Sequence, residues 1–240
     1  MLSSTPFREG IRAAIPVWIA FTTSSFALGV AAKANGLHWG EIVLMSALVY
    51  AGPAQFAVVG PLGAGAPPLQ VLLAGFLINL RFLPMSAALA PYFRRVTRGK
   101  LIAAAHFISA SSFVIPYIRF QREAQKPRAK EADNDESNLH FFLGLSLTSF
   151  SVWVLGTAVG YWAALHVPAE FDEAIKFVLP GYFASLLATE AREWSIRAVC
   201  IASLLIAVPG ALWNPNWGWI VTALVIATLG WGIHQWMRRE

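Results

Sequence analysis

Charged residues are scarce in this chain. Only 13% of its 240 residues are Asp, Glu, Lys or Arg, whereas 57% are hydrophobic and the mean hydropathy is +0.56. Soluble domains carry about a quarter charged residues, so this composition excludes an ordinary soluble domain. It predicts an all-α polytopic membrane protein whose surroundings are the lipid bilayer.

Cysteine and catalytic motifs are also nearly absent. The single cysteine, Cys200, excludes a disulfide framework within the chain and a multi-cysteine metal site. The sequence contains no Gly-rich phosphate loop, no His-Glu-x-x-His metal motif and no serine nucleophile elbow. We therefore expect no enzyme activity, no cofactor and no metal, and a membrane-embedded enzyme ranks last among the functions considered.

The excess of basic residues does not indicate nucleic-acid binding. The net charge is +5 and the pI is near 9.7, but Arg and Lys cluster at the ends of apolar runs, as in cytoplasmic loops of membrane proteins. Basic residues near both ends, Arg8 and Arg12 and then Arg238 and Arg239, predict that both termini face the cytoplasm. No pattern of a cleaved signal peptide is visible, so none is expected.

Eight apolar runs alternate with polar turns, and the longer ones can cross a bilayer as helices. A charged stretch without apolar periodicity, residues 121–138, is expected to be a solvated, mobile linker. The chain then divides into a membrane half at residues 1–120, this linker, and a second membrane half at residues 139–240. The runs cover residues 11–32, 41–60, 69–92, 101–117, 140–165, 171–189, 198–213 and 217–236.

Polar and helix-breaking residues interrupt two of these runs at membrane depth. The first break is Tyr50–Phe56, YAGPAQF, and the second follows at Asn79–Arg81, NLR. Proline lacks a backbone donor and clashes with the carbonyl group four residues back. Pro53 should therefore free the carbonyl group of Val49, and Pro84 that of Leu80. Broken backbone is tolerated in a membrane only where it lines protein or a water-filled cavity. We predict that the two breaks face each other and form a polar site.

The two halves resemble each other weakly when the first is shifted by 127 residues. Gly29 then falls on Gly156, and Pro53 falls on Pro180, without a gap. Gly/Pro-broken segments at corresponding places in two halves are typical of transporters. If all eight runs cross, the halves are parallel with four spans each; if the two broken runs dip in and return, the halves are inverted with three spans each. The sequence favours neither scheme, so we predict six to eight transmembrane segments in two related halves with Gly/Pro-broken helices.

Arg81 is the sharpest candidate for a site residue, because a guanidinium group near mid-membrane is costly unless it is paired. It could clamp a substrate carboxylate or brace carbonyl groups freed by Pro53 or Pro84, and both readings stay open. Gln55 and Asn79 could likewise hold a substrate or satisfy broken backbone. His106 could titrate near neutral pH, but a lone helical histidine is more often a packed polar group. The predicted substrate-binding residues are Gly52, Pro53, Gln55, Asn79, Arg81, Ser24, Ser25, Pro180 and Tyr182.

Several of these segments carry a family resemblance. Residues 50–56 and 78–89, INLRFLPMSAAL, resemble the two signature stretches of the AzlC family, and residues 7–16, FREGIRAAIP, fit its opening. In the second half, residues 153–160 and 177–183 also fit. The resemblance covers nearly the whole chain except the charged linker, and the pairing of AGxxQF with NLR is its most specific part.

The resemblance implies a function that composition and spacing alone do not supply. It implies the large subunit of a branched-chain amino acid exporter in the bacterial inner membrane, accompanied by a small membrane subunit of the AzlD type. In the fourth run, where we expect the family to carry an acidic pair, this chain has residues 106–112, HFISASS. The expected function is secondary export of small hydrophobic amino acids; the alternative is a channel-like or scaffolding subunit that needs a small partner.

Overall fold

The computed structural model describes residues 4–124 and 131–168, together with positions 170, 181, 205, 206, 209, 212, 218, 221, 222, 225, 226 and 228. Within the two continuous ranges every regular element is helical, which confirms the predicted all-α class. Three stretches there are long and apolar enough to cross a membrane: Thr5–Ala34, Pro68–Phe93 and Asp135–Ala164. The number of segments in the whole chain and its division into two halves stay predictions. The elements are α1 (Ser4–Ala34), α2 (Trp39–Val49), α3 (Gly52–Gly63), α4 (Pro68–Asn79), α5 (Phe82–Leu89), the 3₁₀ helix η1 (Ala90–Phe93), α6 (Arg98–Ala105), α7 (Ala110–Ala124) and α8 (Glu131–Ala164).

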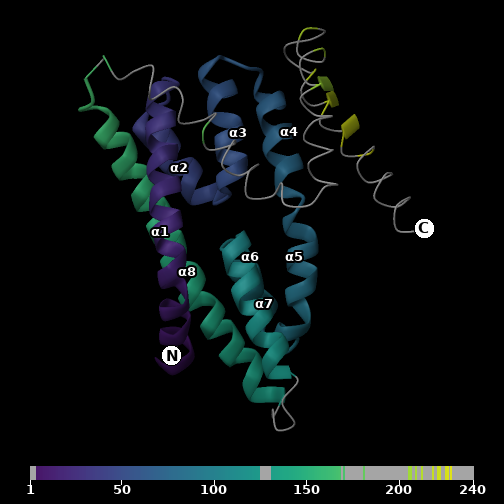
Figure 1. Ribbon diagram of the computed structural model, residues 1–240. Helices are drawn as coiled ribbons and strands as arrows, with labels where there is room; N and C mark the ends of the chain where they lie inside the picture. The colour runs from purple at the N-terminus through teal and green to yellow at the C-terminus, as the bar shows by residue number, and fades with distance from the viewer. Residues whose placement is uncertain are drawn as a thin grey trace.

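Helices α1 and α8 form a parallel pair that extends along the bundle (Figure 1). Phe7 lies against Gly144, and Ser25 lies against Gly156, so residue numbers rise together along the two helices. Neither of these glycines has room for a β-carbon, which lets the two backbones approach closely. Gly29, the residue that the 127-residue shift pairs with Gly156, packs into the same interface from α1.

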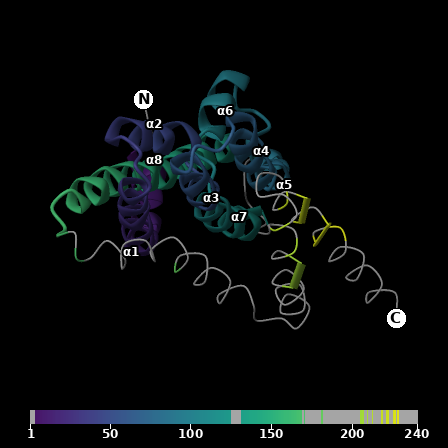
Figure 2. The same cartoon turned by 90° about the horizontal axis from the view of Figure 1, so that it is seen from above.

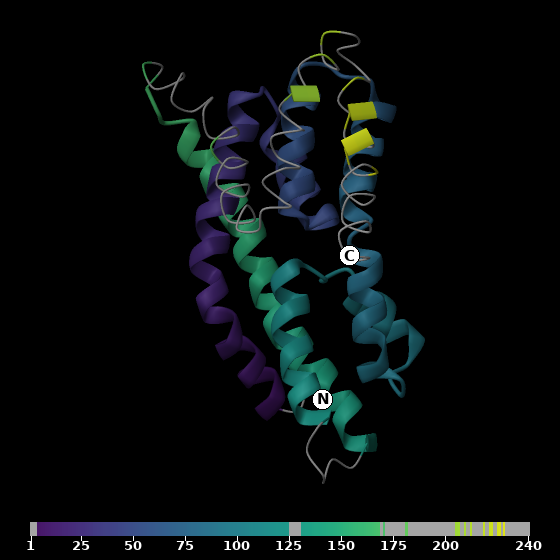
Figure 3. The ribbon, with the colours of Figure 1, turned by 45° about the vertical axis from the view of Figure 1, so that its right-hand side comes forward.

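Helices α2 and α3 form a re-entrant hairpin instead of one membrane-spanning helix. The chain turns at Tyr50 and Ala51, between the end of α2 and the start of α3. Gly63, the last residue of α3, packs against Asn35, which directly follows α1, and α2 starts at Trp39 just beyond that turn. Both ends of the hairpin therefore lie at the end of the bundle where α1 finishes (Figure 3). This α2–α3 hairpin enters from and returns to one side.

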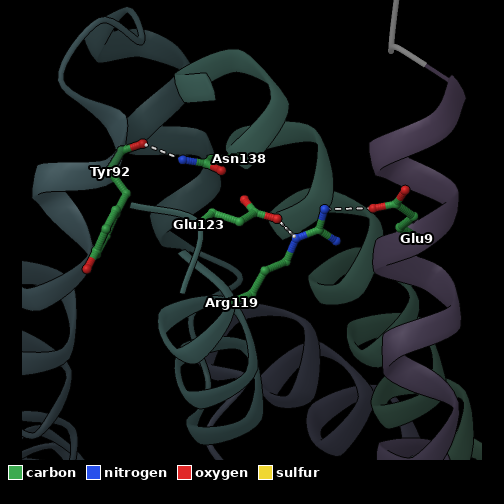
Figure 4. A network of polar contacts seen from close by, with 5 residues as sticks. All are labelled: Glu9, Tyr92, Arg119, Glu123 and Asn138. Atoms are coloured by element: carbon green, nitrogen blue, oxygen red, sulfur yellow. Dashed lines mark hydrogen bonds and ion pairs between the residues drawn. The ribbon is translucent and has the colours of Figure 1, made fainter. Parts of the chain in front are cut away.

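A second re-entrant hairpin, α6–α7, enters from the opposite end of the bundle. The Lys100 Nζ atom near the start of α6 lies 2.7 Å from a carboxylate oxygen of Glu136, near the start of α8. Arg119, late in α7, makes a 2.7 Å ion pair with Glu9 near the start of α1 (Figure 4). Both ends of this hairpin therefore lie beside the first turns of α1 and α8. The prediction that residues 101–117 form one span is wrong.

This arrangement differs from both predicted topologies. Two runs of the first half dip in and return, so the scheme in which every run crosses does not hold for the described residues. Helix α8 runs parallel to α1, so the halves cannot be inverted copies that begin with these two helices. Between the two hairpins, only α4, α5 and η1 carry the chain from one end of the bundle to the other (Figure 1). Two crossings, one by α1 and one by α4 to η1, explain why α8 regains the direction of α1.

The stretch expected to be an unstructured linker is largely helical. Residues 121–124 belong to α7, and residues 131–138 form the first two turns of α8, which leaves only residues 125–130 outside the described part. Its acidic residues suit a helix start, because a carboxylate near a helix N-terminus is stabilised by the helix dipole. Asp135 accepts a 2.8 Å hydrogen bond from the backbone N–H of Arg95, and the Asn138 side chain donates to the carbonyl group of Tyr92 (Figure 4). Solvation alone therefore does not describe this stretch.

Candidate functional site

The α2–α3 break is a buried turn with one unusual backbone conformation. Tyr50 adopts φ 41°, ψ 45°, in the left-handed region that non-glycine residues seldom occupy, and it is 2% exposed. Pro53 is the second residue of α3, where a missing N–H costs nothing. Strained backbone of this kind concentrates at functional sites, so the backbone conformation alone makes the turn a candidate site. The break expected at Gly52 and Pro53 is thus present.

Gln55 closes a ring of buried hydrogen bonds that fixes this turn to α8. Its Oε1 atom accepts from the indole N–H of Trp153 at 2.8 Å, and its Nε2 atom donates to the Ser46 hydroxyl group at 2.8 Å. Ser46 donates to the Thr157 hydroxyl group at 3.3 Å, and Thr157 donates back to the carbonyl group of Trp153 at 2.9 Å. All four side chains are at most 4% exposed. Both polar atoms of Gln55 are therefore bonded within the protein, and its substrate role stays a prediction.

The second break, between α4 and α5, differs from its prediction in one detail. The carbonyl group of Leu80 is not freed by Pro84, because it accepts a 3.0 Å hydrogen bond from the backbone N–H of Leu83. Pro84 is the third residue of α5, where no intrahelical donor is required. The Oδ1 atom of Asn79 is buried and has no hydrogen-bond partner in the part of the chain that the structure describes. Arg81 is half-buried, with its guanidinium carbon 5.1 Å from the centre of the Phe82 ring.

The two breaks lie at a similar depth on neighbouring helices. Helices α3 and α4 are antiparallel partners, with Gly75 facing Val58. Arg81 lies six residues after Gly75, and Gly52 lies six residues before Val58. Both residues are therefore the same number of positions from this contact, in the direction of the break. Arg81 is therefore level with the first residue of α3, as Figure 1 shows for the ends of α3 and α4. The predicted meeting of the two breaks agrees with this geometry.

A third break, between α6 and α7, was missed by the sequence analysis. Ser109 and Ser112 bond reciprocally: the Ser109 N–H donates to Ser112 Oγ at 2.7 Å, and the Ser112 N–H donates to Ser109 Oγ at 3.3 Å. These two bonds resemble a capping box, the arrangement that starts a helix. The S-x-x-S spacing in residues 109–112 was the available signal, but it was read as hydroxyl groups inside a span.

The third break touches the first through His106. The Nε2 atom of His106 lies 2.8 Å from the carbonyl oxygen of Ala47, a group that would bond to the N–H of Ala51 if α2 continued. The Tyr50 hydroxyl group is buried and has no hydrogen-bond partner in the part of the chain that the structure describes. The Tyr50 and His106 rings also share the Phe150 ring of α8, at 5.1 and 5.9 Å between centroids. The tips of the two hairpins therefore meet.

The remaining predicted residues fall into two groups. Ser25 is fully buried, donates to the Thr22 carbonyl group at 3.3 Å and packs against Gly156, so it belongs to the α1–α8 contact. Ser24 is half-buried on the same helix. Pro180 and Tyr182 lie outside the described residues. The 127-residue shift relates residues 41–60 to residues 171–189, and we predict that these two broken runs lie side by side; that prediction also falls outside the described residues. Within the described part, no cluster of His, Cys, Asp and Glu could hold a metal ion.

Two cavities lie at opposite ends of the bundle, each beside one hairpin. One, of about 370 Å³, lies between α5, η1, α6 and α8 at the end that carries the N-terminus. The other, of about 520 Å³, lies at the opposite end among Asn35, His38, Glu41 and Gly63. The structure thus defines a helical membrane protein in which broken helices from both ends meet near the middle, with a cavity at each end.

Comparison with known proteins assigns this membrane protein to a family. The model of the AzlC family, described as AzlC protein, matches residues 16–167, and the chain belongs to that family. It is 26% identical to the inner membrane protein YgaZ of Escherichia coli K12 over 208 residues, which are 85% of this chain and 80% of YgaZ. An uncharacterized membrane protein of Archaeoglobus fulgidus is 27% identical over 197 residues, covering 81% of this chain and 80% of that protein. No solved structure matches the chain.

Proposed function

We propose that this protein is a secondary transporter that exports small hydrophobic amino acids, of the branched-chain type, across the bacterial inner membrane. The observation that carries the proposal is the meeting of the α2–α3 and α6–α7 breaks near the middle of the bundle, with Arg81 at the level of the first residue of α3. Broken helices at mid-membrane are how transporters expose helix ends and backbone groups to a substrate. The branched-chain preference rests on the family resemblance.

The chemistry of the breaks suits the two charged groups of an amino acid. The N-terminus of α3 carries partial positive charge and lies near the same depth as Arg81, so together they favour a carboxylate. Gly52 has no side chain to obstruct the approach of a ligand to the first turn of α3. The buried Oδ1 atom of Asn79, which has no partner among the described residues, is an acceptor that suits the substrate ammonium group.

The distribution of charge supports an orientation with the N-terminus in the cytoplasm. The end of the bundle that carries the N-terminus holds eight basic residues in the described part, whereas the opposite end holds Lys33. Cytoplasmic loops of membrane proteins are enriched in Lys and Arg. Because both hairpins are re-entrant, the loop at residues 94–100 lies on the same side as the described residues of the stretch at 121–138, and both lie on the N-terminal side. The eight residues are Arg8, Arg12, Arg94, Arg95, Arg98, Lys100, Arg119 and Arg122.

The second candidate function is a channel-like or scaffolding subunit that needs a small membrane partner of the AzlD type. The observation that favours it is the large apolar surface of α4 to α6. Leu72 is 69% exposed, Leu83 is 68% exposed and Ile102 is 75% exposed. Lipid can cover such surface, and so can a small apolar subunit. If lipid covers this surface, the isolated chain should transport; if a small subunit covers it, the isolated chain should be inactive.

Counterflow in reconstituted vesicles separates the two functions. Vesicles that contain the purified chain and unlabelled leucine are diluted into labelled leucine, with and without a co-purified AzlD-type subunit. Saturable, stereospecific accumulation of label by the chain alone supports the exporter. Activity that appears only with the small subunit supports the second candidate, and non-saturable leakage of both enantiomers contradicts the exporter.

A further inference from the structure

We propose that the 370 Å³ cavity is a cytoplasmic vestibule that binds the exported amino acid by its carboxylate before the substrate reaches the helix breaks. This inference rests on the proposed function and adds a second substrate site to it. The cavity lies between α5, η1, α6 and α8, and its volume is within the range of small-molecule sites. None of the substrate-binding residues predicted from the sequence lines it.

Two arginines give this vestibule an affinity for anions. Arg94 and Arg98 line the cavity and are exposed. Their neighbour Lys100 is paired with Glu136, and Asp135 is engaged by the backbone N–H of Arg95. In the described part of the chain, neither Arg94 nor Arg98 has a carboxylate partner. A recess lined by cations that lack partners raises the local concentration of anions.

The walls of the vestibule suit the other end of the same ligand. Beyond the two arginines the lining is mostly aliphatic and aromatic, including Leu101 of α6 and Phe142 of α8. A free inorganic anion gains nothing from such walls, whereas an aliphatic side chain loses water against them. The fitting ligand is therefore a small carboxylate with an aliphatic side chain, which is the chemistry of the proposed substrate.

The inner end of the vestibule leads toward the helix breaks. Ala105 and Ile108 line the cavity, and they flank His106 at the turn between α6 and α7. His106 in turn reaches the carbonyl oxygen of Ala47 beside the α2–α3 break. Helix α6 therefore forms the wall between the vestibule and the meeting point of the hairpins. Only the thickness of α6 therefore separates a substrate held at Arg94 and Arg98 from the side of the bundle that carries Arg81.

The first test separates the two faces of the protein. In oriented vesicles, R94Q/R98Q should raise the KM for leucine presented at the N-terminal side about fivefold, with little change in maximal rate, because an exposed ion pair is worth a few-fold at most. The KM for leucine presented at the opposite side should not change. The matched control is R122Q, which removes an exposed charge from the same end but lies outside the cavity. Equal KM values for R94Q/R98Q and R122Q would overturn the vestibule.

The second test does not depend on transport. In a C200A background, A105C should react with a membrane-impermeant maleimide from the N-terminal side, and leucine should slow the labelling while leucine amide should not. Labelling from the opposite side only, or equal protection by acid and amide, would overturn the vestibule. Protection by leucine without counterflow would contradict the proposed exporter and keep the vestibule. Counterflow without protection, together with an unchanged KM in R94Q/R98Q, would keep the exporter and remove the vestibule.

Discussion

The two re-entrant hairpins have the same helix–turn–helix arrangement but differ in how deeply they are buried in the bundle. In the α2–α3 hairpin the turn and the start of α3 are buried: Tyr50, Ala51 and Gln55 are each at most 2% exposed. In α6, by contrast, Ala104 is the one buried residue, and Ile102 is 75% exposed. The turn of the first hairpin is enclosed and its arms contact α1, α4 and α8, although Leu44 and Leu48 of α2 are exposed; in the second hairpin α6 lies at the surface (Figure 2).

The polar contacts of the two hairpins differ in the same way. The α2–α3 turn is fixed by a closed ring of hydrogen bonds in a water-free interior, where each partner would be costly to leave unsatisfied. The ends of α6–α7 are held by ion pairs whose side chains are 30–52% exposed, and such pairs contribute little to stability. We therefore expect α2–α3 to act as a fixed frame and α6 to be the arm that moves during transport.

The largest effect should come from breaking the ring in the fixed hairpin. Gln55→Leu leaves the Trp153 N–H without a partner in a buried setting and removes the bond to the Ser46 hydroxyl group, which keeps its bond to Thr157. It should lower the free energy of unfolding by about 1.5–4.5 kcal/mol, at roughly 1–3 kcal/mol for the orphaned N–H and 0.5–1.5 kcal/mol for the lost bond. The measurement is thermal or denaturant unfolding in detergent. Gln70→Leu is the control, because Gln70 is also buried but its Oε1 atom has no partner in the described part. Equal losses in both variants would show that the ring does not fix the hairpin.

Arg81, at the level where the hairpins approach α4 and α5, should show the next largest effect. Arg81→Lys keeps the charge but loses the planar two-pronged donor, so leucine binding should weaken by about 1.5–3 kcal/mol if the guanidinium group clamps the carboxylate. Amino acid amides should be poor substrates of the wild type and should lose less in the variant. The measurement is the ratio of acid to amide transport in both proteins. An unchanged ratio with a lowered melting temperature would make Arg81 a structural brace.

In the α6–α7 hairpin, a substitution should change the solvent exposure of α6 more than the stability of the protein. His106→Ala removes the hydrogen bond to Ala47 that joins the hairpin tips, a net loss of about 0.5–1.5 kcal/mol. We expect maleimide labelling of A105C to become several-fold faster, with a small change in melting temperature. His166→Ala is the control, because His166 bonds to the Trp162 carbonyl group of its own helix end. Faster labelling in both variants, or in neither, would contradict the inference that the bond from His106 to Ala47 holds the two hairpin tips together.

Part of this architecture could be predicted from the sequence, because membrane burial makes certain residues informative. A Gly-Pro pair and an arginine inside apolar runs are costly enough to mark the α2–α3 and α4–α5 breaks. The α6–α7 break was missed because serine is tolerated in continuous membrane helices as well as at helix starts. The Gln55 ring could not be foreseen, since it joins residues about 100 positions apart in the chain.

The charged stretch shows the opposite error. We predicted a mobile linker, whereas its described residues are helical and bond to other elements. Its composition has no apolar face, and a solvated linker of this kind would tolerate deletion of residues 123–137 without loss of export. The structure places residues 131–137 in α8 and pairs Asp135 and Glu136 with the loop that begins α6. We now expect that deletion to reduce folding of the chain, because it removes the first turns of a helix in the central pair.

The smallest effect should come from the surface ion pair of the movable arm. In a double-mutant cycle of Lys100→Ala and Glu136→Gln, the coupling energy should be below about 1 kcal/mol, because both side chains are about half exposed. It should vanish near 1 M salt, where the screening length is about 3 Å. The same cycle on Gln55→Leu and Ser46→Ala should give a larger coupling that salt does not change, because water and ions do not reach the ring. Similar salt sensitivity in the two cycles would mean that the hairpins are held alike, and that burial does not decide which of them moves.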